Sequence, residues 1–208
     1  MNIRSNVICL IACFSMWLCS TQDATSQGPP ADGLTSKVTE LRRLAEEGNA
    51  EAQNNLGVRY NNGEGVPKDQ DEALRWYRLA AAQDYAMAQN NLGLMYHKGE
   101  GVTKDYAEAL RWISSAAQKG YADAQDNLGV MYSKGDGVTK DAVEAVKWFR
   151  LATAQGLARA QTNLGYMYEK GDGVPQEATE AVRLYRLAAR QGFAHAQFNL
   201  GNIYREGN

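Results

Sequence analysis

The sequence has little that a catalytic or metal site requires. Its 208 residues include two histidines and three cysteines, and Cys9, Cys13 and Cys19 all fall near the start of the chain. Neither His97 nor His195 has a ligand-spaced neighbour, and no Ser-x-x-Lys motif or nucleophile elbow occurs. We therefore predict no catalytic residue, no metal site and no cofactor.

Strong charge and long apolar runs are also lacking. The formal net charge is −2, and no basic stripe is visible, so we predict no nucleic-acid partner. The apolar run from Val7 to Leu18 is shorter than the roughly 20 residues that a membrane-spanning helix needs. A stable membrane span is therefore not expected. Only four prolines occur, which suits helices.

The first residues have the layout of a secretory signal peptide, because Arg4 precedes the short apolar run. We expect a signal peptide over residues 1–24, a polar linker over 25–33, and export to the periplasm, the cell envelope or the medium. Leu10-Ile11-Ala12-Cys13 resembles a bacterial lipidation box, which would make Cys13 an acylated anchor. The continuing apolar run favours a signal core with a chance cysteine, and a buried N-terminal helix is a third alternative.

The chain does contain an internal repeat. The sequence Asn-Leu-Gly recurs every 36 residues, and a tyrosine follows each glycine by three positions. The glycines are Gly57, Gly93, Gly129, Gly165 and Gly201. A repeat of this length indicates one helical unit stacked on copies of itself, with an extended surface in place of a central core.

Each unit predicts two helices. In residues 86–121 the first helix should run over 86–98 and the second from about 105 to 119, with first helices starting near 50, 86, 122, 158 and 194. Asp105 and Glu108 have the spacing of a capping box, and Glu177 is a weaker cap in the fourth copy. Gly120, Gly156 and Gly192 should close the second helices in the left-handed conformation, where the first copy has Asp84.

A glycine inside each first helix costs about 1 kcal/mol relative to alanine. We therefore expect close backbone contact there, with an aromatic ring of the neighbouring helix filling the space. Trp76, Trp112 and Trp148 recur in register on the second helices and are interpreted as core. The asparagine column recurs unchanged two residues before each glycine. It could clamp a peptide backbone, but its recurrence favours a role in satisfying inter-helix or turn amides. Its members are Asn55, Asn91, Asn127, Asn163 and Asn199.

Together these residues resemble the Sel1-like repeat, a close relative of the tetratricopeptide repeat, over about residues 37–207. The resemblance is carried by Ala88, Gln89, Asn91, Leu92, Gly93, Tyr96, Gly99, Gly101, Val102, Asp105, Ala109, Trp112, Ala116, Ala117 and Gly120. It implies an all-α fold, a right-handed α/α superhelical solenoid over residues 34–208, that acts as an adaptor or scaffold. Some members are cysteine-rich and linked to β-lactam binding, but this chain lacks those cysteines.

Comparison of the copies suggests a binding face. Four positions of the first helix vary between copies, and their offsets of 3, 4 and 3 place them on one face, which we expect to line the concave side. A solvated face is the plainer alternative, but apolar residues recur on it. The predicted contacts for a protein or peptide are Val58, Met87, Asn90, Leu94, His97, Asp126, Val130, Arg159, Thr162, Tyr166 and Phe198.

Two other functions stay open. Exposed aromatic residues such as Tyr166 and Phe198 would also suit a peptidoglycan or glycan, and a β-lactam-type hydrolase is the enzymatic alternative.

The two ends of the array differ from the inner repeats. Thr35 or Ser36 should cap a polar-faced helix that runs through Glu47 in the register of a second helix. The chain ends after a first helix, which predicts fraying or self-association through the C-terminal end.

Overall fold

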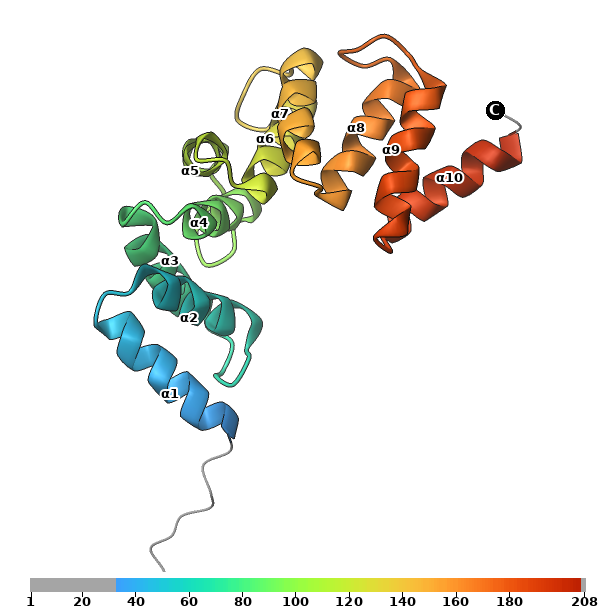
Figure 1. Ribbon diagram of the computed structural model, residues 1–208. Coiled ribbons are helices and arrows are strands. Elements are labelled where there is room, and N and C mark those ends of the chain that lie inside the picture. The colour runs from blue at the N-terminus through green and yellow to red at the C-terminus, as the bar shows by residue number, and fades with distance from the viewer. Residues whose placement is uncertain (1–32, 207–208) are drawn as a thin grey trace, which may run out of the picture.

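The computed structural model describes residues 33–206, which form ten α-helices and no strand (Figure 1). The all-α fold is confirmed, and the repeats follow one another along a curved, right-handed α/α superhelix. The predicted signal peptide, Cys13 and linker residues 25–32 lie outside the described residues. None of the helices in the described part is long and apolar enough to cross a membrane.

The helices alternate between two sets. The first helices of the repeats are α2 (Ala50–Asn62), α4 (Ala86–Lys98), α6 (Ala122–Lys134), α8 (Ala158–Lys170) and α10 (Ala194–Glu206). The second helices are α3 (Gln70–Ala82), α5 (Tyr106–Gln118), α7 (Ala142–Ala154) and α9 (Ala178–Arg190), and α1 (Gly33–Glu46) precedes them in the same register. The predicted starts of the first helices are confirmed. The predicted cap of α1 is wrong, because the helix begins at Gly33 and already contains Thr35 and Ser36.

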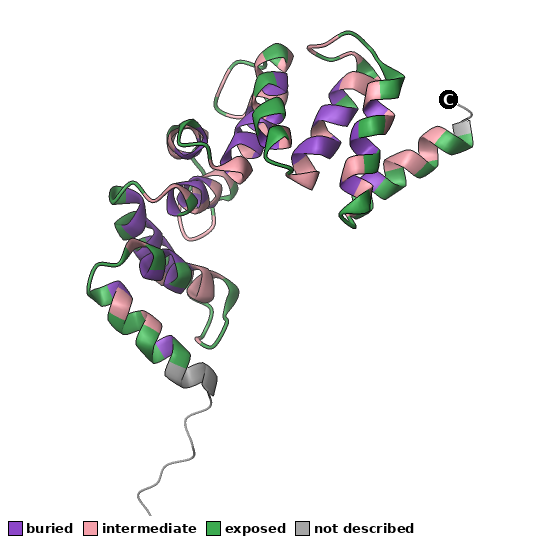
Figure 2. Ribbon diagram, in the orientation of Figure 1, coloured by how far each residue is buried: buried purple, intermediate pink, exposed green. Residues whose placement is uncertain are grey.

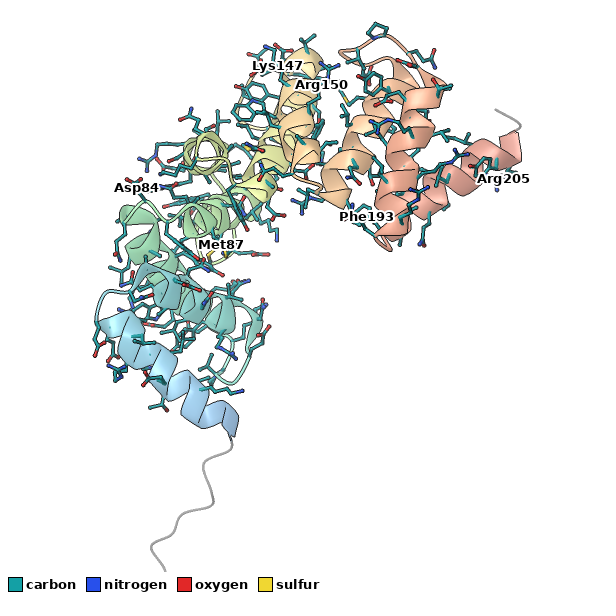
Figure 3. All side chains as sticks on the ribbon, in the orientation of Figure 1. Asp84, Met87, Lys147, Arg150, Phe193 and Arg205 are labelled. Atoms are coloured by element: carbon teal, nitrogen blue, oxygen red, sulfur yellow. The ribbon has the colours of Figure 1, made fainter. Side chains whose placement is uncertain are left out.

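Helices that are adjacent in sequence are also adjacent in space, so the molecule is an arc without a central core. Figure 3 places Met87 and Phe193 on the inner side of the arc, and Lys147 and Arg150 on its outer side. Each repeat therefore contributes its first helix mainly to the inner side. This arrangement gives neighbouring first helices a shared surface, which is where the predicted contacts fall.

Most of the glycines inside the first helices lie at close contacts between helices, as expected from the stability that a glycine costs inside a helix. A Cβ added at Gly129 would lie 2.7 Å from the ring of Phe149, and Gly57 and Gly165 meet Tyr77 and Tyr185 in the same way. The expectation of an aromatic ring is confirmed at these three junctions. At Gly93 the neighbour is an aliphatic side chain, Ile113, at 2.6 Å, and at Gly201 nothing lies within 4 Å.

Helix caps follow the sequence only in part. Asp105 Oδ1 accepts hydrogen bonds from the backbone N–H groups of Ala107 and Glu108, at 2.9 and 3.0 Å, and Glu177 makes no such bond. The second half of the predicted capping box is wrong. The Asp105 N–H donates to Tyr96 O instead, and Glu108 Oε2 accepts from Trp112 Nε1 at 3.1 Å. The carboxylate thus fixes a core-facing indole.

The turns after the second helices are closed as predicted. Gly120, Gly156 and Gly192 have φ angles of +86°, +85° and +82°, and Asp84 has φ +64° in the first copy. The left-handed conformation favours glycine, so Asp84 is the strained member of the set.

Candidate functional site

The predicted binding face divides into buried and open positions. One of its four columns, which we call the junction column, comprises Asn54, Asn90, Asp126, Thr162 and Phe198. Its first four members are buried. Asn90, Asp126 and Thr162 are therefore wrong as freely exposed contacts. The physical reason is that the side chains of this column meet the first helix of the next repeat, in addition to the packing of each first helix against the second helices on either side of it. The sequence interpretation placed the buried residues of a first helix on one face only.

The asparagine column bonds to the junction column across each repeat boundary. Asn91 Nδ2 donates to Asn54 Oδ1 at 3.0 Å, and Asn127 Nδ2 donates to Asn90 Oδ1 at 2.8 Å. Asn163 Nδ2 donates in the same way to Asp126 Oδ1 at 2.8 Å. The predicted inter-helix role is confirmed for these three asparagines. Buried polar side chains of successive repeats thereby satisfy one another.

The third boundary carries a charged pair in place of neutral groups. Arg159 Nε binds Asp126 Oδ2, while Nη2 donates to Asn127 Oδ1 at 3.3 Å and lies 3.2 Å from Asp123 Oδ1. Burial raises the pKa of the Asp126 carboxyl, and Arg159 and Asn163 oppose that rise. Arg159 keeps 42% of its side chain exposed, and its Nη1 makes no hydrogen bond within residues 33–206.

His97 is tied to a distant loop. Its Nε2 lies 2.8 Å from Asp136 Oδ2, in the turn between α6 and α7, and its ring meets that of Tyr106 edge-on with centroids 5.1 Å apart. Both His97 and Asp136 are partly buried. The structure therefore places His97 in a contact between repeats, with 26% of its side chain exposed.

A hollow of about 430 Å³ lies on the inner side, across three consecutive first helices. It is lined by Asp126, Asn127, Val130, Arg159, Thr162, Asn163, Tyr166, Phe193, His195 and Asn199. The structure thus brings together five predicted residues: Asp126, Val130, Arg159, Thr162 and Tyr166. The buried members form its floor, and Tyr166, 48% exposed, stands at its edge.

The other predicted residues lie outside this hollow. Val58 and Leu94 are half-buried and pack against the core, while Met87 is exposed on the inner side. Asn90 belongs to the second boundary, and His97 contacts the α6–α7 turn. Phe198 is exposed on α10 and does not line the hollow.

Sequence reasoning missed the remaining lining residues. Phe193 precedes α10 in the turn, at the position that Tyr85 and Tyr121 occupy in earlier copies, so its aromatic recurrence was a usable signal. His195 packs against it with ring centroids 5.5 Å apart. For the column of Asn163 and Asn199 the sequence favoured a structural role over a clamp for a peptide backbone, because the column recurs unchanged. Asn163 bonds across a boundary and also lines the hollow.

The hollow combines polar groups with aromatic walls. Asn163 uses its Nδ2 on Asp126, and its Oδ1 has no hydrogen-bond partner in the part of the chain that the structure describes. Arg159 binds the other oxygen of the same carboxylate through Nε, which leaves its Nη1 as an unused donor within residues 33–206. Within residues 33–206 no group of three potential ligands is arranged to hold a metal ion. A donor and an acceptor between aromatic rings are the groups that hold a peptide backbone and its side chains.

Comparison with known sequences gives the family. The sequence matches the Sel1 repeat over residues 50–85, 86–121, 122–157, 158–193 and 194–208. The chain belongs to the Sel1 repeat family. Sel1 repeats generally form non-catalytic scaffolds for interactions between proteins. The comparison with curated proteins finds no match.

Solved structures share this Sel1 repeat fold. A protective antigen present in uropathogenic Escherichia coli strains, displaying an SLR fold, is 46% identical with a TM-score of 0.75, over 82% of this chain and 36% of the antigen. This chain therefore spans about a third of the antigen's length. A Sel1 repeat protein from Oxalobacter formigenes is 36% identical with a TM-score of 0.73, over 82% and 76% of the two chains. An immunity protein from Pseudomonas aeruginosa is 26% identical with a TM-score of 0.55, over 76% and 59%.

Proposed function

We propose that this Sel1 repeat chain is a non-enzymatic adaptor that binds an extended segment of another protein along the inner side of its arc. The supporting observation is the hollow across α6, α8 and α10, in which Arg159 Nη1 and Asn163 Oδ1 are unused and Tyr166 and Phe193 form aromatic walls. An extended peptide alternates N–H and C=O groups with side chains, so it can use the donor, the acceptor and the walls together.

Hydrolysis has less support than binding. The one hydroxyl on the floor of the hollow, that of Thr162, donates to Ala158 O of its own helix at 2.9 Å. A nucleophile requires a base within hydrogen-bond reach, and His195 packs against Phe193 instead. We therefore propose binding without turnover. A glycan remains a control ligand, because aromatic walls alone would also suit a sugar ring.

Export is also proposed, on the signal-like residues 1–24 alone. The mass of the chain recovered from an envelope fraction would test it, because cleavage removes that segment. Full-length chain in the cytoplasmic fraction alone would contradict the proposal.

The binding proposal is tested with a display library of random 12-residue peptides and the purified chain. We expect enriched peptides to lose about tenfold or more in affinity on Tyr166→Ala, since truncating an aromatic residue that carries an interface typically costs about 1–2 kcal/mol or more. Leu151→Ala is the matched control, because Leu151 is equally exposed but belongs to outer helix α7. Both variants should melt at the temperature of the native chain.

Three outcomes would contradict the proposal. Peptides that bind the Tyr166→Ala variant as well as the native chain would place the contact elsewhere. Loss of binding in the Leu151→Ala variant would move it to the outer side. Competition by soluble muropeptides in place of peptides would favour the glycan alternative.

A further inference from the structure

Helix α8 carries an unused hydrogen-bond donor and an unused acceptor one turn apart. Arg159 binds two carboxylates and Asn127 through Nε and Nη2, and its Nη1 makes no hydrogen bond within residues 33–206. Asn163 donates its Nδ2 to Asp126, and its Oδ1 accepts no hydrogen bond in the same part of the chain. Positions four apart in a helix are neighbours on one face, with Cβ atoms about 5–6 Å apart. The unused donor and acceptor therefore come from adjacent positions, and both residues line the hollow.

This pair is a departure from the repeat. Among the described residues, the first helices α2, α4 and α6 do not combine a free donor with a free acceptor at these positions. In α4 they hold Met87 and Asn91, and a thioether donates no hydrogen bond. In α6 the Asn127 Oδ1 already accepts from the guanidinium group of the next repeat, and in α2 the Asn55 Oδ1 accepts from Asn54 at 3.2 Å. The pair thus occurs where the hollow lies.

The pair lies beside the buried floor of the hollow. Asp126, which both residues bind, is fully buried, and Figure 2 shows buried residues along the length of α8. Arg159 and Asn163 are themselves partly buried, whereas Tyr166 stands exposed at the edge. A backbone that crosses the hollow passes over this edge, so a side chain is the part of a partner that reaches the pair. The volume of about 430 Å³ falls within the range of ligand pockets and leaves room for one.

Hydrogen bonding selects the kind of side chain. A carboxylate has no hydrogen to donate to Asn163 Oδ1, and an ammonium group has no lone pair for Arg159 Nη1. A hydroxyl donates and accepts through a single oxygen atom, which would have to lie within about 3 Å of both partners. A primary carboxamide places its C=O and its NH2 group on one carbon atom, so it can span two groups that come from positions one turn apart.

The charges around the pair also oppose a carboxylate. Two carboxylates, those of Asp123 and Asp126, face the one guanidinium group of Arg159. Lys170, whose ammonium group lies over an aromatic wall of the hollow, pairs with Glu169. A third carboxylate would therefore enter a site in which negative charge is already in excess.

We propose that the hollow selects partners that carry an asparagine or glutamine side chain. The carboxamide oxygen accepts from Arg159 Nη1, and the NH2 group donates to Asn163 Oδ1. The rings of Tyr166 and Phe193 contact the apolar part of that side chain. This inference rests on the proposed peptide-binding function and adds the residue class that the bound segment must contain.

Peptides selected from the 12-residue library test the proposal. We expect the peptides that depend on Tyr166 to share an asparagine or glutamine at one position. Replacing that residue by its acid, or by leucine or methionine of similar shape, should lower the affinity by about tenfold or more, because a partly buried donor or acceptor is left unpaired. Isothermal titration calorimetry at pH 8, where histidine side chains are ordinarily uncharged, would measure this. The same replacement at a peptide position that tolerates alanine is the matched control and should leave the affinity unchanged.

Arg159→Lys tests whether the carboxamide meets the guanidinium group. Lysine keeps a cation for Asp126 but lacks Nη1. The loss caused by replacing the carboxamide with an apolar side chain should therefore shrink to about threefold or less in this variant, because the two changes remove one contact. Arg150→Lys on outer helix α7 is the matched control and should leave that loss unchanged. Denaturant melts would show that both variants are folded, and the peptide replacements test the proposal on the native chain.

The outcomes separate this proposal from the function on which it rests. Peptides that need Tyr166 but bind equally well with an acid or an apolar side chain in place of the carboxamide would overturn the carboxamide site alone. Tighter binding of a peptide with lysine at that position would do the same. A library that contains no peptide dependent on Tyr166 would overturn the binding function and the carboxamide site together.

Discussion

The junction column shows that one buried position of the repeat can be paired with different side chains at different boundaries between repeats. At the first boundary Asn54 Nδ2 donates to Met87 Sδ at 3.3 Å, and at the third Asp126 binds Arg159. Both solutions satisfy a buried polar group with a side chain 33 positions ahead. The neutral solution carries no charge to desolvate, whereas the charged one buries a carboxylate completely. The third boundary therefore depends on Arg159 in a way that the first boundary does not depend on Met87.

Arg159→Met should destabilise the chain by about 3 kcal/mol, because it leaves the buried Asp126 carboxylate without its cation. Asp126→Asn should be close to neutral at pH 7. The double variant should recover most of the loss, because it reproduces the Asn54–Met87 pair of the first boundary. Chemical denaturation of all three would measure this, and a double variant no more stable than Arg159→Met would contradict it.

The same carboxyl predicts a dependence on pH. Burial raises the pKa of Asp126 above its ordinary value of 3.8, so the folded chain holds this proton more tightly than the unfolded chain. Its protonation therefore favours the fold below pH 3.8, and that contribution is lost as pH rises through the folded pKa. The Asp126→Asn variant has no carboxyl to titrate at this position. As pH rises from 3.8 through the folded pKa of Asp126, the unfolding free energy of the variant should fall less than that of the native chain.

Part of this chemistry was predictable from sequence. The unchanged asparagine column indicated an inter-helix role, because a structural bond needs the same group in every copy. The junction column varied, and variation was interpreted as exposure. A buried position can vary when its partner varies with it, as Asn54 with Met87 and Asp126 with Arg159. Recognising this requires knowing which side chains meet across the boundary, and one helix pattern does not contain that information.

At the scale of the helix, boundaries and turns were the most predictable features. Glycines at left-handed positions and aspartates at helix starts act through the local backbone, so α4 begins and ends where its sequence indicates. The hydrogen bond of Glu108 could not be predicted from the local sequence. The Asp105 N–H, which a capping box would offer to Glu108, donates to Tyr96 O and so joins the end of α4 to the start of α5. Glu108 accepts from Trp112 Nε1 instead.

Replacing the glycine of a first helix by alanine should change the stability of the chain in opposite directions at Gly129 and at Gly201. Gly129→Ala should destabilise the chain by about 1–3 kcal/mol, because the new Cβ would lie 2.7 Å from Phe149 and force the helices apart. Gly201→Ala should stabilise α10 by about 1 kcal/mol through helix propensity, since nothing in residues 33–206 lies within 4 Å of an added Cβ there. Denaturant melts of the two variants would compare them. Equal effects of the two substitutions would contradict this difference in their surroundings.

At the scale of the whole molecule, the repeat predicted the arc, and the inner side remains the predicted side for a partner. It did not predict the hollow, because the hollow forms where three first helices and the Phe193 turn meet. Its position depends on the particular residues of the last three repeats, among them Arg159 and Tyr166. A periodic sequence determines the geometry shared by all copies, and the hollow arises from the departures of individual copies from it.

An array held by contacts between neighbours should also open from its ends. An inner helix such as α6 packs on both flanks, whereas within residues 33–206 α1 packs only against α2, and α10 only against α9. Because local opening requires breaking only the contacts of the segment that opens, we expect amides of α10 to exchange about tenfold or more faster than those of α6 in dilute solution. Hydrogen exchange followed by mass spectrometry would measure this. Protection that is uniform from α2 to α10 would instead indicate a single cooperative unit, in which contacts at each boundary are strong enough to couple all the repeats.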